Sequence, residues 1–251
     1  MSALLELRKV SKSFGGVHAV DEISFSLAQG ELIGLIGPNG AGKTTVFNLV
    51  SGIQALSRGE ILYRGSVISG SSPTHIARRG IARTFQNVRL FSSLTVIEHV
   101  LVAQTCRKAD LLALFSPVAT SAERTRKRRA LEVLDLVGLT PRRDELALHL
   151  PYGGQRRLEI ARALATSPEL LLLDEPAAGL NDTETEDLRT MLESLRASGY
   201  AILLVEHDMK LVMRLCPRIL VLNFGKLIAS GTPAEVRANQ EVVDAYLGTS
   251  D

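Results

Sequence analysis

The sequence predicts an α/β fold in which a largely parallel sheet is preceded by antiparallel strands and interrupted by a helical insertion. Three short runs, at residues 31–37, 170–173 and 201–205, are almost continuously apolar, as strands buried on both faces are. Helical periodicity separates these runs, and strands that alternate with helices favour a parallel core. Alternating apolar residues in the first 30 positions indicate antiparallel strands with one face in water.

The N-terminal third is expected to contain these antiparallel strands, one buried strand and a helix. Alternating apolar residues predict the first two strands: Leu5, Leu7, Ile23, Phe25 and Leu27. A helix with one apolar stripe is expected after residues 31–37, formed by Val46, Leu49, Val50 and Ile53. Residues 59–65 then predict a short strand between glycines.

The middle of the chain is expected to be helical. From about residue 95 to 139 the apolar period is that of a helix, with an interruption around Ser116-Pro117. A helical stretch at 184–196 separates the last two buried runs, and the chain closes with a predicted hairpin, R-I-L-V-L-N-F-G-K-L-I-A-S-G, and a short helix. We therefore expect a single domain over residues 1–251, with a core at about 1–87 and 166–251 and a helical insertion at about 88–165.

Composition narrows the function classes. The 251 residues carry a net charge of +2 and 4% aromatic residues without tryptophan, which argues against a nucleic-acid partner. The two cysteines fit a reducing compartment and exclude a disulfide-rich secreted scaffold. Charge within the first six residues argues against a signal peptide, and no apolar run approaches the ~18–20 residues that span a bilayer. Any membrane part is expected to come from another chain.

A phosphate-binding loop is predicted by G-P-N-G-A-G-K-T, residues 37–44, between a predicted strand and a predicted helix. Its four fixed positions arise by chance in about one chain in a hundred of this length. We expect Lys43 to reach the β- and γ-phosphates of a nucleotide and the Thr44 hydroxyl to coordinate Mg²⁺. The alternative is a flexible glycine-rich turn. The candidate phosphate-binding residues are Gly37, Pro38, Asn39, Gly40, Ala41, Gly42, Lys43, Thr44 and Thr45.

Polar side chains follow the two later buried strands. In L-L-L-L-D-E-P, Asp174 is expected to hold Mg²⁺ through its waters and Glu175 to orient or deprotonate an attacking water. A surface turn with two acids is the alternative. His207 follows residues 201–205 and is expected near the γ-phosphate, because ligands of open α/β sheets bind beyond the carboxyl ends of strands. Taken alone, it would be a structural histidine. Gln86 follows I-A-R-T-F, and its amide could contact Mg²⁺ or the attacking water. The sequence alone does not decide whether it does so.

A second glycine pair lies in Y-G-G-Q, residues 152–155, directly before a strongly patterned helix. Such a turn offers backbone N–H groups and a helix N-terminus to an anion. It lacks the lysine of the first loop, so the sequence predicts a second anion site of a different kind.

Six ordered motifs resemble those of ATP-binding-cassette ATPases: the phosphate loop, Gln86, Y-G-G-Q, L-L-L-L-D-E-P, A-G-L-N and His207. The resemblance covers essentially the whole chain. In finer detail the chain is similar to the first of the two paired ATPases of branched-chain amino-acid importers, through R-T-F-Q-N-V-R-L-F, L-E-I-A-R-A-L, D-E-P-A-A-G-L-N, E-H-D-M-K-L-V-M and A-Y-L-G. It implies the fold of that family, a P-loop NTPase core with an N-terminal antiparallel β subdomain and an inserted α-helical subdomain.

The resemblance implies an enzyme that hydrolyses ATP, with Mg²⁺, to power a membrane importer. It would be a peripheral subunit at the cytoplasmic face of the inner cell membrane. The implied partners are a second ATPase chain, two transmembrane permease subunits and, indirectly, an extracytoplasmic substrate-binding protein. In such dimers the glycine turn of one chain closes on the nucleotide held by the other, whose own lysine grips the phosphates. Here that turn is Tyr152, Gly153, Gly154 and Gln155.

Further roles are implied by position. Phe14 fits the aromatic residue that stacks on adenine, Val20 fits the wall of the same pocket, and Gln86 fits the loop that links Mg²⁺ to the permease. Residues 178–181 fit a loop that crosses the dimer interface.

The chain departs from the family pattern at several positions. Pro151 and Tyr152 stand where Leu-Ser is usual, Asn181 replaces an aspartate, and Phe14 replaces the commoner tyrosine. The serine hydroxyl that meets the γ-phosphate in the family is therefore missing. We hypothesise that the site completed by this chain's Y-G-G-Q is weaker than the other site of the dimer.

Two further stretches suggest contacts outside the nucleotide site. E-R-T-R-K-R-R, residues 123–129, is expected to be a solvated helix face, with contact to anionic lipid headgroups as the alternative. Residues 88–103 contain more apolar residues than one short helix can bury. We expect part of them, around Leu90 and Phe91, to form a groove for a helix of the membrane subunit, flanked by Arg83 and Arg89.

Three other functions compete with the importer ATPase. An exporter ATPase for lipid or polysaccharide would have a closely similar sequence. A soluble cassette ATPase acting on ribosomes or DNA usually has two cassettes or a long coiled-coil insert, and neither is found in this chain. A P-loop kinase would need an arginine-bearing lid and would have no use for Y-G-G-Q or His207.

Overall fold

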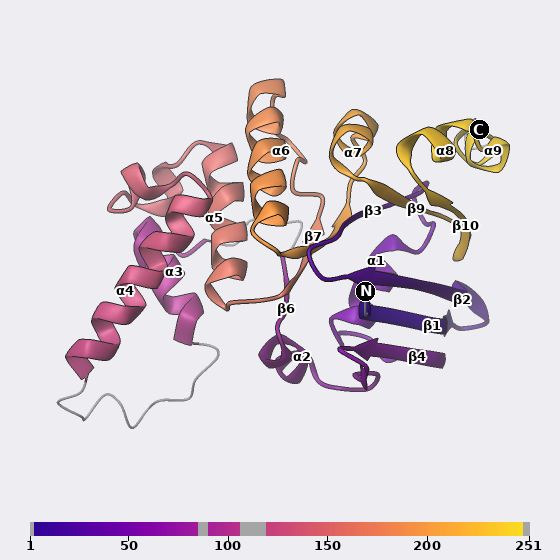
Figure 1. Ribbon diagram of the computed structural model, residues 1–251, viewed down its shortest axis with the longest axis horizontal. Helices are drawn as coiled ribbons and strands as arrows, with labels where there is room; N and C mark the ends of the chain where they lie inside the picture. Colours follow the sequence, from indigo (N-terminus) through magenta and orange to yellow (C-terminus); the bar gives the residue numbers. More distant parts are fainter. Residues whose placement is uncertain (1–2, 85–89, 106–118, 248–251) are drawn as a thin grey trace. The chain divides into compact units, whose positions relative to one another are not determined.

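The computed structural model describes residues 3–84, 90–105 and 119–247 (Figure 1). The chain divides into two compact units. The first contains Met1–Arg83, Glu169–Glu175 and Arg196–Asp251, and the second contains Thr84–Pro168 and Pro176–Leu195. This division assigns most of helix α6 (Asp182–Ala197) to the second unit, whereas we expected it in the core. The domain boundaries expected from the sequence stay a prediction.

A four-stranded antiparallel sheet in the first unit contains the N-terminal strands. Its order is β2 (Val17–Ala28), β1 (Ala3–Phe14), β4 (Arg58–Tyr63) and β5 (Ser66–Val67). The alternating apolar residues all point into the core, with exposures of 9% or less: Leu5, Leu7, Ile23, Phe25 and Leu27. The predicted alternation is therefore confirmed.

A six-stranded sheet forms the centre of the first unit. Its order is β10 (Lys226–Gly231), β9 (Arg218–Asn223), β3 (Leu32–Ile36), β8 (Ala201–Val205), β7 (Leu170–Asp174) and β6 (Ile81–Arg83). Neighbouring strands are parallel except for the β9–β10 hairpin. Every residue of β3, β7 and β8 is buried, as the continuous apolar runs predict. The polar residues that follow these strands consequently lie at one edge of the sheet.

The helices of the first unit are short. They are α1 (Lys43–Val50), α2 (Pro73–Arg79), α7 (Met209–Leu215), α8 (Pro233–Ala238) and α9 (Gln240–Leu247). The expected stripe on α1 is wrong at Ile53, which lies beyond the helix and is 47% exposed. Gly52 causes this early end, because its φ of 71° is the left-handed conformation that terminates helices.

The second unit is helical in the part that the structure describes. Helices α3 (Val96–Thr105), α4 (Ala119–Leu136) and α5 (Tyr152–Ala165) pack on one another through buried apolar residues: Val96, Val100, Ala130, Leu134, Leu158 and Ala161 (Figure 1). Short 3₁₀ turns at Thr140–Arg142 and Ala147–His149 join α4 to α5. The interruption expected around residues 116–117 lies outside the described residues.

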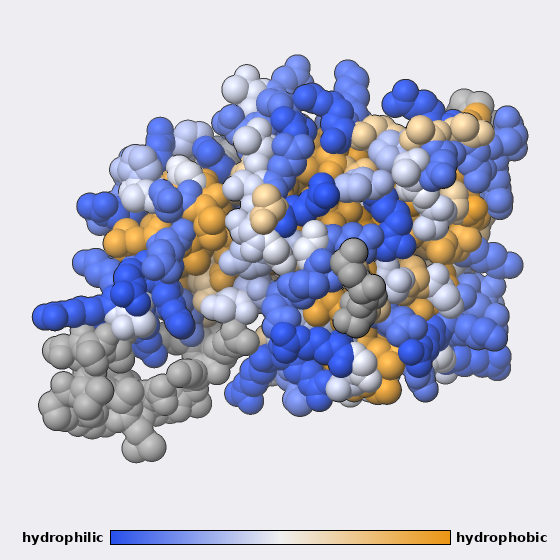
Figure 2. Space-filling view, in the orientation of Figure 1, coloured by the Kyte–Doolittle hydropathy of each residue, from blue (hydrophilic) through white to orange (hydrophobic). Residues whose placement is uncertain are grey.

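The basic stretch of α4 is almost entirely exposed, as expected of a solvated helix face. On the face drawn in Figure 2, hydrophilic residues predominate over this helix. No helix among those described is long and apolar enough to cross a membrane.

Candidate functional site

The predicted phosphate loop connects β3 to α1, as the sequence indicates. Two of its glycines are required by backbone geometry. Gly37 has a φ of 151°, and a Cβ there would lie 2.1 Å from the carbonyl oxygen of Leu222. Gly42 has a φ of 106°, and a Cβ there would lie 2.4 Å from the carbonyl oxygen of Ala19. Only glycine fits these two positions, so the loop keeps its sharp curl.

Lys43 folds back over the loop that precedes it. Its Nζ donates hydrogen bonds to the carbonyl oxygens of Gly37, at 2.7 Å, and Pro38, at 2.9 Å. Burial lowers the pKa of Lys43, while the charges of Glu175 and Asp174 act in the opposite direction. The ammonium group is thus held by carbonyl dipoles close to two carboxylates. A phosphate could replace the carbonyls as a stronger partner.

The N-terminus of α1 points out of the same loop. Gly42 occupies the N-cap and has no side chain to accept from the first turn. That turn begins with Lys43, Thr44 and Thr45, which add no negative charge. Its N–H groups and the helix dipole therefore suit an anion such as a nucleotide phosphate.

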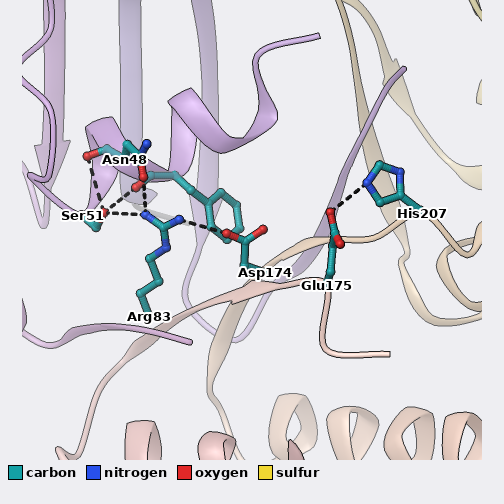
Figure 3. Close-up of polar contacts among 7 residues, drawn as sticks. Asn48, Ser51, Arg83, Asp174, Glu175 and His207 are labelled. Atoms are coloured by element: carbon teal, nitrogen blue, oxygen red, sulfur yellow. Dashed lines mark hydrogen bonds and ion pairs between the residues drawn. The ribbon is translucent and has the colours of Figure 1, made fainter. Parts of the chain in front are cut away.

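Asp174, the last residue of β7, is ion-paired with Arg83, the last residue of β6 (Figure 3). Arg83 Nη2 lies 2.9 Å from Asp174 Oδ2, and the two side chains are 9% and 8% exposed. Arg83 Nη1 also donates to Asn48 Oδ1 at 2.7 Å and to Ser51 Oγ at 3.2 Å, so it joins β7 to the end of α1. The expectation that Arg83 flanks an exposed groove is wrong, because its guanidinium is buried against these partners.

Glu175 and His207 form the second polar pair at this edge of the sheet (Figure 3). Glu175 Oε1 lies 2.8 Å from His207 Nε2, and the two side chains are 17% and 47% exposed. The Glu175 N–H donates to the Val205 carbonyl on the neighbouring strand at 2.9 Å. Glu175 has a φ of 49°, an uncommon conformation for a residue with a side chain, which turns it away from the line of β7. The structure therefore brings together two of the predicted catalytic residues.

The other predicted residues of the first unit lie at different depths. The Phe14 ring is 44% exposed and has the Lys12 ammonium 4.8 Å from its centroid, so one face is available for stacking. Val20 is fully buried in the core. Gln86, Arg89 and the start of the segment that we expect to contact the permease lie outside the described residues. Phe91, near the start of the described part of that segment, is 53% exposed.

The second glycine turn opens helix α5 in the second unit. Pro151 is the N-cap, Tyr152 is the first helical residue, and Gly153 and Gly154 are buried. The Tyr152 ring is 42% exposed, with the Arg156 guanidinium 5.3 Å from its centroid. Gln155 Nε2 donates to the Leu150 carbonyl at 2.9 Å, a hydrogen bond that joins the first turn of α5 to the residue before its N-cap.

The oxygen atoms of Thr44 and Asp174 are of the kind that binds Mg²⁺. Across the described residues, no cluster of three or more His, Cys, Asp or Glu side chains gathers to hold a metal ion. Mg²⁺ instead takes few protein ligands and completes its shell with waters and phosphate oxygens. Thr44, which is exposed at the start of α1, and Asp174, at the end of β7, are oxygen donors of that kind.

Three residues near these sites carry contacts that the sequence analysis missed. Arg83 pairs with Asp174, and Glu184 accepts the Gly153 N–H at 3.2 Å. Tyr246, on the C-terminal helix α9, receives a hydrogen bond from the Gly37 backbone, and its hydroxyl lies 4.0 Å from Met209 Sδ. Burial raises the pKa of Tyr246. The signal available in the sequence was a charged or polar residue next to each motif, without any indication of its partner.

Most of the chain matches known protein families. Residues 20–178 match the family described as "ABC transporter". Residues 226–251, which include β10, α8 and α9, match the family described as "Branched-chain amino acid ATP-binding cassette transporter".

Curated relatives match over nearly their full length. The high-affinity branched-chain amino acid transport ATP-binding protein LivG of Salmonella typhimurium is 47% identical over 249 residues, which cover 98% of each chain. The corresponding protein BraF of Pseudomonas aeruginosa is 45% identical over 250 residues, again with 98% of each chain covered. The lipopolysaccharide export system ATP-binding protein LptB of Escherichia coli is 37% identical over 247 residues with the same coverage.

Solved structures agree in fold. A crystal structure of an ABC transporter ATP-binding cassette in its ADP conformation is 28% identical, with a TM-score of 0.87 over 99% of this chain and 100% of that chain. A dimeric bacterial ABC transporter cassette is 25% identical, with a TM-score of 0.76 over 91% of this chain and 98% of that chain.

Proposed function

Since the chain belongs to the ABC transporter family of ATP-binding proteins, we propose that it hydrolyses ATP to energise a membrane importer of branched-chain amino acids. The observation that carries the enzymatic part is the Glu175–His207 pair, in which Oε1 and Nε2 lie 2.8 Å apart. Burial lowers the pKa of Lys43 in the phosphate loop, and the charge of Glu175 acts to raise it. The cargo is supported by the names of relatives at 45–47% identity and by the family that matches residues 226–251.

ATP binding is proposed to exchange the partners of Lys43. The ammonium leaves the carbonyls of Gly37 and Pro38 and pairs with the β- and γ-phosphates, which lie at the N-terminus of α1. The Phe14 ring stacks on adenine from its exposed face. Because the loop glycines already fix the curl, this exchange moves one side chain and leaves the backbone in place.

Glu175 is proposed to act as the general base on the attacking water. His207 holds its carboxylate at 2.8 Å, and since an ionised carboxylate only accepts, the proton of this hydrogen bond lies on His207 Nε2. His207 thereby orients the Glu175 carboxylate beside the γ-phosphate. Thr44, Asp174 and Gln86 would hold Mg²⁺, which supplies positive charge beside the phosphates when it is bound.

The working unit is proposed to be a dimer of ATPase chains bound to two permease subunits at the cytoplasmic face of the membrane. The dimeric cassette among the solved relatives supports pairing of two such chains. The turn at Tyr152, Gly153, Gly154 and Gln155 would close on the nucleotide held by the neighbouring chain. A cargo-loaded extracytoplasmic binding protein would act indirectly, through the permease.

The proposal is tested by reconstituting the chain with its membrane subunits and following uptake of labelled leucine and release of phosphate. Glu175→Gln keeps the shape of the side chain and removes the base, so we expect the ATPase rate to fall at least about 100-fold with ATP binding retained. Glu193→Gln, at a partly exposed ion pair with Arg189 on α6, is the control and should behave as the wild type.

Uptake that survives Glu175→Gln would refute the assignment of the base. An ATPase rate that is the same with and without the cargo-loaded binding protein would contradict the proposal that the chain energises an importer. The 37% identity to LptB makes lipopolysaccharide export the second candidate, and in that case the chain would co-purify with an export permease and fail to move leucine.

A further inference from the structure

One carboxylate in the second unit joins two segments that are distant in sequence. Glu184, in the first turn of α6, accepts the Gly153 N–H at its Oε1 atom, 3.2 Å away. Its Oε2 atom accepts the Asn181 N–H at 3.1 Å, and its own N–H donates to Asn181 Oδ1 at 2.9 Å. The glycine turn before α5 and the loop before α6 therefore share a single side chain.

Glu184 supplies a helix cap that the chain around α5 does not provide. An N-cap side chain normally accepts from the second or third N–H of its helix, and Pro151, the N-cap of α5, has no acceptor in its side chain. Gly153 is the second residue of α5, so Glu184 fills this role from another helix. The positive ends of both helix dipoles face the same negative charge, which favours the arrangement.

Packing makes the contact specific. A Cβ at Gly153 would lie 2.7 Å from Glu184 Oε1 and 2.9 Å from its Cδ, so a side chain at this position would displace the carboxylate from its contact. On the same side, the Tyr152 ring lies 3.0 Å from where a Cβ of Gly179 would stand. The cavity lined by Gly153, Arg156 and Glu184 is only about 10 Å³, which is room for at most one water. The two segments are thus packed directly against each other.

We propose that Glu184 is a positioning residue that fixes the glycine turn at residues 152–155 to the loop at 178–181, so that both meet a neighbouring cassette as one rigid piece. This inference rests on the proposed function, which assigns both segments to the face that closes on the neighbour's nucleotide. The Gly153 N–H is held by Glu184, and the Gln155 N–H donates to the Pro151 carbonyl at 3.0 Å, so the Gly154 N–H between them has a fixed direction. Closure on a phosphate then requires no reordering of the turn.

The test compares three variants of Glu184 in the full chain assembled with its partner cassette and permease. Glu184→Ala removes both hydrogen bonds, and Glu184→Asp shortens the side chain by one methylene and loses its reach to Gly153. Glu184→Gln keeps an oxygen at that position. The matched control is Glu235→Ala, because Glu235 closes the capping box of α8 by accepting the Thr232 N–H at 2.7 Å, far along the chain from either segment.

We expect Glu184→Ala and Glu184→Asp to lower the ATPase rate of the assembly at least tenfold. ATP binding to the isolated chain, which depends on its own phosphate loop, should stay within twofold of the wild type. Glu184→Gln should recover at least half of the rate, and Glu235→Ala should stay within twofold. A rate for Glu184→Ala and Glu184→Asp equal to that of Glu235→Ala, or a parallel loss of ATP binding in the isolated chain, overturns the inference.

A wild-type assembly without ATPase activity would be a failure of the proposed function and not of this contact. Amide hydrogen exchange of Gly153, measured by NMR on the isolated chain, separates the two cases. Exchange at least tenfold faster in Glu184→Ala than in the wild type supports the tie between the segments. Unchanged exchange overturns it whatever the enzyme does.

Discussion

Asp174 and Glu175 are adjacent in sequence and have different partners. Asp174 continues the line of β7 and meets Arg83, whereas Glu175 turns away with a positive φ and meets His207. The first carboxylate is almost fully buried and the second is partly exposed. This separation suits their proposed roles, since a metal-binding carboxylate must stay ionised and a base must reach water.

The buried ion pair predicts a large effect on stability. Arg83→Met leaves the Asp174 carboxylate without its cation, and loss of one partner of a buried pair costs about 3–5 kcal/mol. Arg83→Met with Asp174→Asn removes the charge as well and should recover much of this loss. The control is Arg64→Met, at an exposed pair with Glu169, where about 0–1 kcal/mol is expected. Urea unfolding of the three variants and the wild type measures these losses; equal losses for Arg83→Met and Arg64→Met would contradict the prediction.

At the scale of elements, His99 ties helix α3 to the turn before it. Its Nε2 accepts the Phe91 N–H at 2.9 Å, so the neutral ring carries its proton on Nδ1, which lies 2.9 Å from the Thr95 carbonyl oxygen. Burial lowers the pKa of His99, and the charge of Arg162 on α5 acts in the same direction, while the Thr95 carbonyl and Glu98 oppose it. This hydrogen bond ties to α3 the backbone of Phe91, a residue of the segment expected to contact a permease.

Acid should therefore weaken the second unit. The unfolded chain binds a proton at His99 near pH 6.5, and the folded chain does so only at lower pH, because burial disfavours the charged ring and Arg162 repels it. The stability that the neutral His99 ring contributes is therefore fully present above pH 6.5, and it is lost as the pH falls towards the lower pKa of the folded chain. We expect the free energy of unfolding to fall more steeply between pH 6.5 and 5 in the wild type than in His99→Gln. Parallel curves for the two proteins would contradict this.

Elements with a strong local pattern could be predicted from the sequence, and those set by distant contacts could not. The runs in β3, β7 and β8 were recognisable because burial on both faces requires continuous apolar residues. The end of α1 was missed because a stripe of apolar residues continued past Gly52. The partner of Asp174 was missed because it depends on β6 lying beside β7, an order of strands that no local pattern specifies.

At the scale of the whole molecule, the cassette fold expected from the six motifs is confirmed by the solved ATP-binding cassettes, which match almost the entire chain. The phosphate loop, Glu175 and His207 were predictable because each follows a buried strand. Glu184 and Tyr246 were not, because their partners, Gly153 and Gly37, lie more than 30 residues away in the sequence. Family motifs thus identified the residues proposed to touch the nucleotide and left out those that hold them in place.

In the proposed dimer with a second ATPase chain, the two nucleotide sites should differ in rate. The site closed by this chain has Tyr152 where the family has a serine hydroxyl, and the Tyr152 ring is instead packed between Arg156 and Gly179. One charge-assisted hydrogen bond is worth about 1.5–3 kcal/mol, so Tyr152→Ser should raise the rate of that site by about tenfold or more. Silencing one site at a time with Lys43→Ala, or the matching change in the neighbour, measures each rate. Equal rates at both sites would contradict the prediction.

The Arg83–Asp174 pair has a mechanical consequence. Arg83 ends β6, and Gln86 follows only three residues later in the chain. In the proposed complex, a force from the permease on that segment would therefore act on Arg83, whose guanidinium is anchored to Asn48, Ser51 and Asp174. In the proposed transporter, this one buried guanidinium would couple movement of the permease to Asp174, the residue proposed to hold Mg²⁺, over a distance of only a few residues along the chain.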